Sequence, residues 1–157
     1  MLGYNNEQLK TLLERLKTVS VVECIQLSTD LHIPCPSSVT CVKPSGTVSQ
    51  LVDSASGIHP RHSKYYIRRV RGDKKDPLTT FMVQQGIPAE DCVMRPESTT
   101  VFSFPKKAPD SATLRDDLTA IEHLDLWMTY QKHWCEHKPS VTISVKEDEW
   151  VEVGAWC

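Results

Sequence analysis

The fold class is decided by the stretch Ser38-Val-Thr-Cys-Val-Lys-Pro-Ser-Gly-Thr-Val-Ser-Gln-Leu-Val-Asp-Ser-Ala55. Its first part, 38–43, is short, rich in β-branched residues and followed by proline, which predicts a buried strand. Residues 44–47 predict a turn, and 47–55 predict a short helix that ends at Gly57. A strand, a turn and a helix in this order are typical of an α/β protein.

The sequence on either side continues this alternation. Apolar residues at three- and four-residue steps predict helices over 5–31, 78–85 and 113–133, with Thr113-x-x-Asp116 resembling a capping box. Alternating or β-branched patterns predict strands over 64–71, 99–104 and 140–145. We therefore expect an α/β architecture with a largely parallel sheet or barrel.

Composition restricts the class of protein. The chain has 157 residues with 39% hydrophobic and 24% charged, which is ordinary for a folded domain. No apolar run reaches the roughly 18 residues that a membrane span needs, and the N-terminus lacks a signal peptide's apolar core. These features predict a cytoplasmic protein without a membrane partner. The six cysteines include no Cys-x-x-Cys pair, which predicts reduced thiols.

Positive charge gathers in one segment of a chain whose net charge is −2. Residues 61–75 hold seven of the eighteen basic side chains and one acid, Asp73. A basic segment inside a near-neutral chain favours a phosphate-bearing ligand over general nucleic-acid affinity. A solvated surface strand would give the same pattern, so charge alone leaves both interpretations open.

The segment Lys43-Pro-Ser-Gly-Thr-Val-Ser-Gln50 is a candidate anion site. A helix start presents unpaired N–H groups, and Gly46 would let the backbone approach a ligand closely. Ser45, Thr47 and Ser49 add hydroxyl donors. The order of residues is not that of a Walker A loop, and a serine or threonine that merely caps a helix is the alternative.

The segment His133-Trp-Cys-Glu-His137 invites a zinc assignment that the spacing does not support. On a helix the two histidines share a face, whereas Cys135 points roughly 200° away. Such a pair needs two further ligands from elsewhere. We therefore predict no metal ligand in this chain.

Five blocks in order carry a resemblance to a known family: 40–51, 57–60, 65–69, 100–105 and 133–145. Together they resemble the large catalytic chain of adenosylcobalamin-dependent (class II) ribonucleoside-triphosphate reductase. The resemblance implies that 1–157 is a single partial domain, the C-terminal portion of a ten-stranded α/β barrel.

The resemblance also implies two sites. Substrate phosphates would bind at Pro44, Ser45, Gly46, Thr47, Val48 and Ser49. The cobalamin-binding region would include Gly57, His59, Pro60, Tyr65, Tyr66, Arg68 and Arg69, without implying that His59 ligates cobalt.

The family converts ribonucleotides to deoxyribonucleotides by radical chemistry with adenosylcobalamin and a thioredoxin-type reductant. Its radical cysteine and glutamate come from an Asn-Pro-Cys-x-Glu-like segment that this chain lacks, so no catalytic residue is predicted. The expected partners are a ribonucleotide and the missing parts of the same reductase, and Gly154–Cys157 predicts a truncated chain. A stand-alone nucleotide- or cobalamin-binding module, or a non-functional remnant, are the alternatives.

Overall fold

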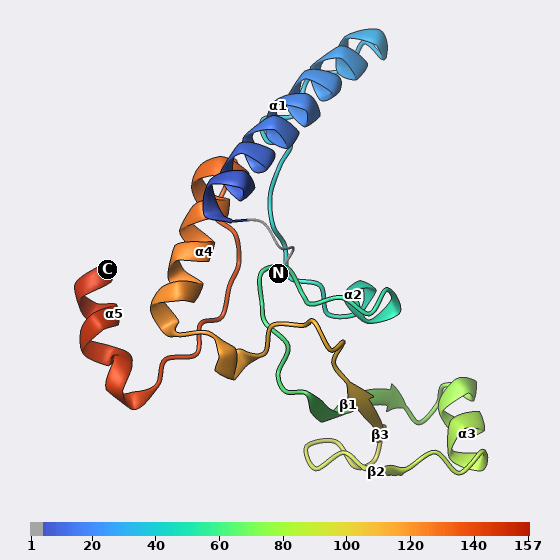
Figure 1. Cartoon of the computed structure of the whole chain (residues 1–157). Helices are drawn as coiled ribbons and strands as arrows, with labels where there is room; N and C mark the ends of the chain where they lie inside the picture. The colour runs from blue at the N-terminus through green and yellow to red at the C-terminus, as the bar shows by residue number, and fades with distance from the viewer. Residues whose placement is uncertain (1–4) are drawn as a thin grey trace. The chain divides into compact units, whose positions relative to one another are not determined.

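The computed structural model describes residues 5–157, which form two compact units (Figure 1). His62–Asp110 make up one of them, which we call the sheet unit. Residues 5–61 and Ser111–Cys157 make up the other, the helical unit. The helical unit contains the predicted phosphate loop, and the predicted cofactor residues are divided between the two units.

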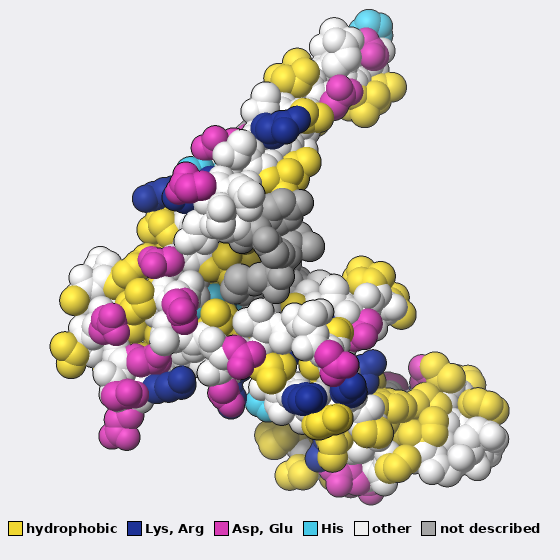
Figure 2. All heavy atoms as spheres, in the orientation of Figure 1, with side chains coloured by type: hydrophobic (Ala, Val, Ile, Leu, Met, Phe, Trp, Pro, Cys, Tyr) yellow, Lys and Arg dark blue, Asp and Glu magenta, His cyan; other side chains and the backbone are white. Residues whose placement is uncertain are grey.

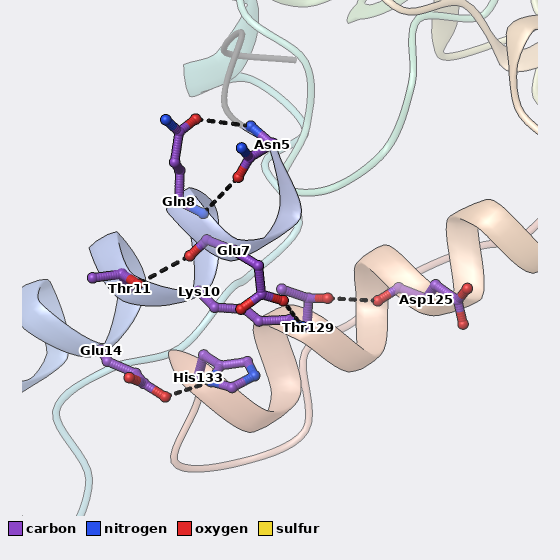
Figure 3. A network of polar contacts seen from close by, with 9 residues as sticks. All are labelled: Asn5, Glu7, Gln8, Lys10, Thr11, Glu14, Asp125, Thr129 and His133. Carbon is purple, nitrogen blue, oxygen red and sulfur yellow. Dashed lines mark hydrogen bonds and ion pairs between the residues drawn. The ribbon is translucent and has the colours of Figure 1, made fainter.

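The helical unit begins with α1, Asn6–Asp30. The side chain of Asn5 accepts a hydrogen bond from the N–H of Gln8 at 2.9 Å, and the Gln8 side chain accepts one from the N–H of Asn5 at 3.1 Å (Figure 3). This capping box satisfies two donors that a helix start leaves open. The helix predicted over 5–31 is confirmed, and the β-branched residues at 19–22 do not interrupt it.

The second long helix, α4, spans Ala120–His133 and begins later than predicted. Its capping box is formed by Thr119 and Glu122, whose side chains each accept from the other's N–H. Thr113, where the box was predicted, is not the N-cap of α4, and its carbonyl accepts from the N–H of Arg61 at 2.9 Å. The intervening residues make the short 3-10 helix η1, Arg115–Asp117.

Two shorter pieces complete the helical unit. The helix α2, Val48–Leu51, is shorter than the helix predicted over 47–55. The acidic segment near the C-terminus forms η2, Glu147–Glu149, and α5, Trp150–Trp156, which the sequence pattern did not predict. α5 packs on α4, since the indole N–H of Trp156 donates to Asp125 at 3.0 Å. α4 also lies beside the first half of α1 (Figure 1).

The sheet unit contains a three-stranded antiparallel sheet in the order β1-β3-β2. The strands are β1, Tyr65–Asp73, β2, Ala89–Asp91, and β3, Thr99–Lys107, and the helix α3, Pro77–Gln84, follows β1. The strands predicted over 64–71 and 99–104 and the helix over 78–85 are confirmed, whereas β2 was not predicted. β3 runs through Pro105, which is tolerated because β2 pairs only with the beginning of β3.

A close contact joins α3 to the sheet. A Cβ added at Gly72 in β1 would lie 2.4 Å from the Thr79 hydroxyl of α3 and 3.3 Å from the ring of Phe102 in β3. Phe102 is 1% exposed and forms the centre of this small core. Glycine at position 72 is therefore what allows α3 to pack this closely.

Two predicted strands are wrong. Residues 38–43 and 140–145 form no strand, and the sheet found within 5–157 is antiparallel rather than largely parallel. Their β-branched residues suit extended backbone, but a strand also needs a neighbour with matching donors and acceptors. The α/β class is confirmed. The ten-stranded barrel and the single partial domain stay predictions.

None of the helices in the described part of the chain combines the length and the apolar composition that crossing a bilayer requires.

Candidate functional site

The predicted phosphate loop, 44–49, is held by a reciprocal pair of serines. The Ser45 hydroxyl accepts from the N–H of Ser49 at 2.9 Å, and the Ser49 hydroxyl donates to the Ser45 carbonyl at 2.7 Å. Ser49 is 3% exposed, so its side chain fixes the loop from inside. The Ser45 hydroxyl keeps its own proton available for another acceptor.

The outer side of the loop carries open donors. Within 5–157 no acceptor is found for the N–H groups of Thr47 and Val48, and the Thr47 side chain makes no capping hydrogen bond. A Cβ added at Gly46 would meet nothing within 4 Å, so packing of the chain itself does not require glycine there. Because α2 is only one turn long, these donors rather than a helix dipole are what would attract an anion.

An unpaired acceptor follows these donors in the sequence. The side-chain oxygen of Gln50 is buried and has no hydrogen-bond partner among the described residues. A buried polar atom without a partner costs free energy, so such atoms usually meet a donor from a ligand, a water molecule or another part of the protein. Open main-chain donors and one buried, unpaired acceptor therefore lie within the short stretch 47–50.

The ends of the loop region are joined by Ser56 and Gly57. The N–H of Ser45 donates to the Ser56 hydroxyl at 2.7 Å. Gly57 has φ +58°, and a Cβ there would lie 3.2 Å from Val42 and 3.3 Å from the Lys43 carbonyl. Gly57 was assigned to the cobalamin region, and in the structure its visible role is to let the chain return against the start of the phosphate loop.

Arg61 fixes the far side of the same loop region. It is 7% exposed and donates to the Asp53 carbonyl at 2.5 Å and to the Asp53 carboxylate at 3.1 Å. Asp53 has φ +47°, a left-handed conformation that is unfavourable for a non-glycine residue. The sequence left open whether the basic segment that begins at Arg61 is solvated or binds a ligand, and no local pattern signalled that Arg61 itself is buried.

His59 uses both ring nitrogens inside the protein. Nε2 accepts from the N–H of Thr142 at 2.9 Å, so the proton must lie on Nδ1, which faces the Ser56 carbonyl at 2.6 Å. His123, which is 4% exposed, contacts the neighbouring Ile58 carbonyl through Nε2 at 2.9 Å. The two histidines therefore anchor the turn that contains His59 and Pro60 to the C-terminal segment and to α4.

The residues before the phosphate loop are held by Glu136. Its carboxylate accepts from the N–H groups of Val39 at 2.5 Å and of Thr40 at 2.8 Å. These bonds hold the pKa of Glu136 below its ordinary value. They also replace the strand pairing that was predicted over 38–43. Glu136 lies about a hundred positions away in sequence, so no local signal could have found it.

The cobalamin-region residues of β1 point to two faces of the sheet. Side chains alternate along a strand, so Tyr65 and Arg69 share one face, and Tyr66 and Arg68 share the other. Arg69 forms an ion pair with Glu90 of β2. The remaining residues of the predicted set, Gly57, His59 and Pro60, belong to the helical unit.

The cysteines differ in their surroundings, and all six are free thiols. Backbone N–H groups of Met94 and Arg95, helped by the Arg71 side chain, lower the pKa of Cys92. Burial raises the pKa of Cys135. The expectation of reduced thiols stays a prediction.

His133, in the segment that invited a zinc assignment, contacts α1. His133 Nδ1 lies 2.7 Å from the Glu14 carboxylate of α1, as Figure 3 shows. In the described portion of the chain, no group of three His, Cys, Asp or Glu side chains is arranged to hold a metal ion. His133 instead contributes to the contact between α1 and α4.

Comparison with known proteins gives one consistent answer. No protein-family model matches the chain. An adenosylcobalamin-dependent ribonucleoside-triphosphate reductase of Euglena gracilis is 34% identical over 137 residues, which are 87% of this chain and 19% of the relative. The enzyme of the same name from Lactobacillus leichmannii is 31% identical over 115 residues, 70% of this chain and 15% of the relative.

A solved structure agrees with these relatives. The crystal structure of a B12-dependent (class II) ribonucleotide reductase matches with a TM-score of 0.78 and 26% identity, over 97% of this chain and 22% of the other. The chain thus spans about a fifth of the length of the proteins it matches. The resemblance recognised in the sequence is confirmed: the chain is homologous to one segment of the adenosylcobalamin-dependent, class II ribonucleotide reductases.

Proposed function

We propose that the chain is a working segment of a ribonucleotide reductase that reduces ribonucleotides with adenosylcobalamin and a thioredoxin-type reductant in the cytoplasm. The observation that carries this proposal is the ordered match to about a fifth of such reductases, in sequence and in structure. On its own the segment supplies binding surfaces rather than chemistry, because the Asn-Pro-Cys-x-Glu segment is not in its sequence. The other parts of the same reductase are its partners.

The first binding surface is the phosphate loop, formed by Pro44, Ser45, Gly46, Thr47, Val48 and Ser49. Its N–H groups at Thr47 and Val48 lack acceptors in the described chain, which suits an anion that brings several oxygens. The Ser45–Ser49 pair holds these donors in place before a ligand arrives. A preorganised loop of this kind loses little conformational entropy when substrate phosphates bind.

The second proposed set is the cofactor region, with Gly57, His59 and Pro60 in the helical unit and Tyr65, Tyr66, Arg68 and Arg69 in the sheet unit. Aromatic rings and guanidinium groups suit a cofactor that carries a large flat ring and amide side chains. When bound, adenosylcobalamin supplies the radical through homolysis of its cobalt–carbon bond. His59 has both ring nitrogens engaged by Ser56 and Thr142, so it positions the turn and does not ligate cobalt.

Binding measurements test this function. Isothermal titration of the 157-residue chain with a ribonucleoside triphosphate and, separately, with adenosylcobalamin should give saturable binding of each. Thr47→Pro removes one open N–H and should weaken binding of the triphosphate while leaving cobalamin binding unchanged. Deoxynucleotide formation by the chain alone, with cofactor and dithiol, would contradict the proposal that it lacks the catalytic groups.

A further inference from the structure

A pocket of about 370 Å³ lies at the Asp73–Thr99 end of the β1–β3 ladder in the sheet unit. Its lining combines a nucleophile with charged side chains: Cys92, Arg71, Arg95 and Asp73. Side chains alternate along β1 and Gly72 faces α3, so the Arg71 and Asp73 side chains lie on the face of the sheet away from that helix. A pocket of this volume is large enough for a small-molecule reagent.

Main-chain contacts hold Cys92 at the wall of this pocket. Its N–H donates to the Thr99 carbonyl at 3.0 Å, and its carbonyl accepts from the N–H of Arg95 at 3.1 Å. The side chain of Cys92 is 6% exposed, and its sulfur faces the N–H groups of Met94 and Arg95 and the guanidinium of Arg71. These donors favour the thiolate and lower the pKa of Cys92.

The positive charge of the pocket is largely left open. Neighbouring charges are paired with one another, Arg69 with Glu90 and Lys74 with Asp91. Among residues 5–157, no carboxylate lies within ion-pair distance of the Arg71 or Arg95 guanidinium. Asp73 lines the same pocket and opposes part of their charge. The pocket therefore favours a negatively charged sulfur and any negative charge that a reaction at this sulfur produces.

Apolar side chains follow Cys92 directly. Val93 is 92% exposed and Met94, which lines the pocket, is 85% exposed. Figure 2 shows hydrophobic side chains, in yellow, over much of the visible face of the sheet unit. A sulfur that is mostly covered and has an apolar neighbour is reached more easily by a small uncharged reagent than by a bulky or charged one.

From this geometry we propose that Cys92 is a site of oxidation by small hydroperoxides, with Arg71 and Arg95 stabilising the charges that the reaction moves. The thiolate sulfur attacks one peroxide oxygen, so that an S–O bond forms as the O–O bond breaks. The sulfur is oxidised to sulfenic acid, and the peroxide is reduced to that acid's hydroxyl group and a hydroxide ion, which takes a proton from solvent to become water. The pocket contains no residue of the phosphate loop or of the cofactor region, so this inference does not rest on the proposed function.

The experiment treats the reduced 157-residue chain with hydrogen peroxide, traps sulfenic acid with dimedone, and follows the labelling of each cysteine by mass spectrometry. We expect Cys92 to be labelled about tenfold faster than Cys135, which is also buried but whose pKa is raised by burial. Cys92 should also be labelled before the exposed Cys35 and Cys157. Since Cys92 is the only cysteine of the sheet unit, no second thiol within that unit consumes the sulfenic acid.

Three variants test the role of charge. Arg71→Met should slow the labelling of Cys92 about threefold to tenfold at neutral pH and move the midpoint of its pH–rate curve upward, because fewer sulfurs are then ionised. Asp73→Asn removes the opposing carboxylate and should accelerate labelling. Lys75→Met removes an exposed basic side chain that does not line the pocket, and it should leave the rate unchanged. Circular dichroism checks that each variant keeps its fold.

The outcomes decide the proposal in either direction. Faster labelling in Asp73→Asn together with slower labelling in Arg71→Met supports it. Labelling of Cys92 no faster than that of Cys135, or an unchanged rate and pH midpoint in Arg71→Met, would overturn it. If Arg71→Met does not fold, Asp73→Asn decides alone, since an equal or slower rate in that variant contradicts a site controlled by the charge of the pocket.

Discussion

The two candidate surfaces are built in different ways. In the sheet unit, one uninterrupted register from Tyr65↔Lys107 to Asp73↔Thr99 sets which side chains share a face. In the helical unit, the 44–61 region has a single turn of helix and is held by bonds from side chains to the main chain, including those of Ser45, Ser56 and Arg61. A regular ladder presents side chains, whereas an irregular loop presents its own N–H groups.

This difference suits the two proposed ligands. A phosphate group is bound by backbone donors, and a loop leaves such donors open where a helix or sheet would use them. A large cofactor needs an extended surface of side chains, which a strand face supplies. Substitutions that act on the 44–49 loop should therefore leave the β1–β3 ladder intact, and substitutions in the ladder should leave the loop intact.

The largest effect is expected from Arg61→Met in the helical unit. The variant loses two hydrogen bonds to Asp53. The left-handed backbone of Asp53 then lacks the contacts that the Arg61 side chain makes with it. We expect a loss of about 1.5–3 kcal/mol in the free energy of unfolding, because these bonds involve a charged donor. Urea denaturation gives this value, and amide exchange should accelerate at 45–57.

The same variant should leave the β1–β3 ladder as well protected as in the parent chain. Equal loss of amide protection in β1 and in the loop would contradict the separation of the two units.

Gly72→Ala is the corresponding test in the sheet unit, where it should disturb the packing of α3 on the sheet. The new Cβ would lie 2.4 Å from the Thr79 hydroxyl, so the Thr79 side chain or α3 must shift. Overpacking of this kind costs about 1–3 kcal/mol. Adding Thr79→Ala removes that hydroxyl and should recover part of the loss. Gly154→Ala in α5 meets nothing within 4 Å and serves as the control that should not destabilise.

Ser56→Ala should have a smaller effect. It removes the acceptor for the N–H of Ser45, one neutral hydrogen bond worth about 0.5–1.5 kcal/mol. We expect weaker binding of a ribonucleoside triphosphate with little change in the melting temperature. Unchanged affinity for the triphosphate would show that closure at Ser56 does not organise the loop.

The smallest effect at neutral pH is expected from Glu136→Gln, and it should depend on pH. The fold lowers the pKa of Glu136 from its ordinary value of 4.5, so its stabilisation is complete above that value and is lost as the pH falls further. The melting temperatures of variant and parent chain should converge in acid. A constant difference down to pH 3 would contradict a role for the carboxylate charge.

The sequence predicts the sheet unit better than the loop. Alternating residues in β1 and a β-branched run in β3 carry their own signal, and both strands form where expected. β2 is only three residues long and has little pattern of its own. Residues 38–43 carry a strand signal too, but their donors pair with the distant Glu136. A local pattern cannot report a partner so far along the chain.

The sequence likewise predicts some parts of the candidate site and misses others. Composition and order of residues are enough to propose 44–49 as an anion loop, because serine, glycine and threonine supply donors wherever the loop lies. They are not enough to find Arg61 as a buried anchor or to assign Tyr65 and Tyr66 to opposite faces, since both depend on tertiary structure. Family resemblance supplies the proposed ligands, and the structure supplies the side-chain positions on which the proposed contacts rest.

The central claim is that the 44–49 loop binds substrate phosphates through main-chain N–H groups. The most direct measurement is a ¹⁵N NMR titration of the chain with a ribonucleoside triphosphate and with the matching ribonucleoside. We predict that the amide resonances of Thr47 and Val48 shift with the triphosphate and stay in place with the nucleoside. Equal shifts with both compounds, or no shift of these two amides at saturating triphosphate, would contradict it.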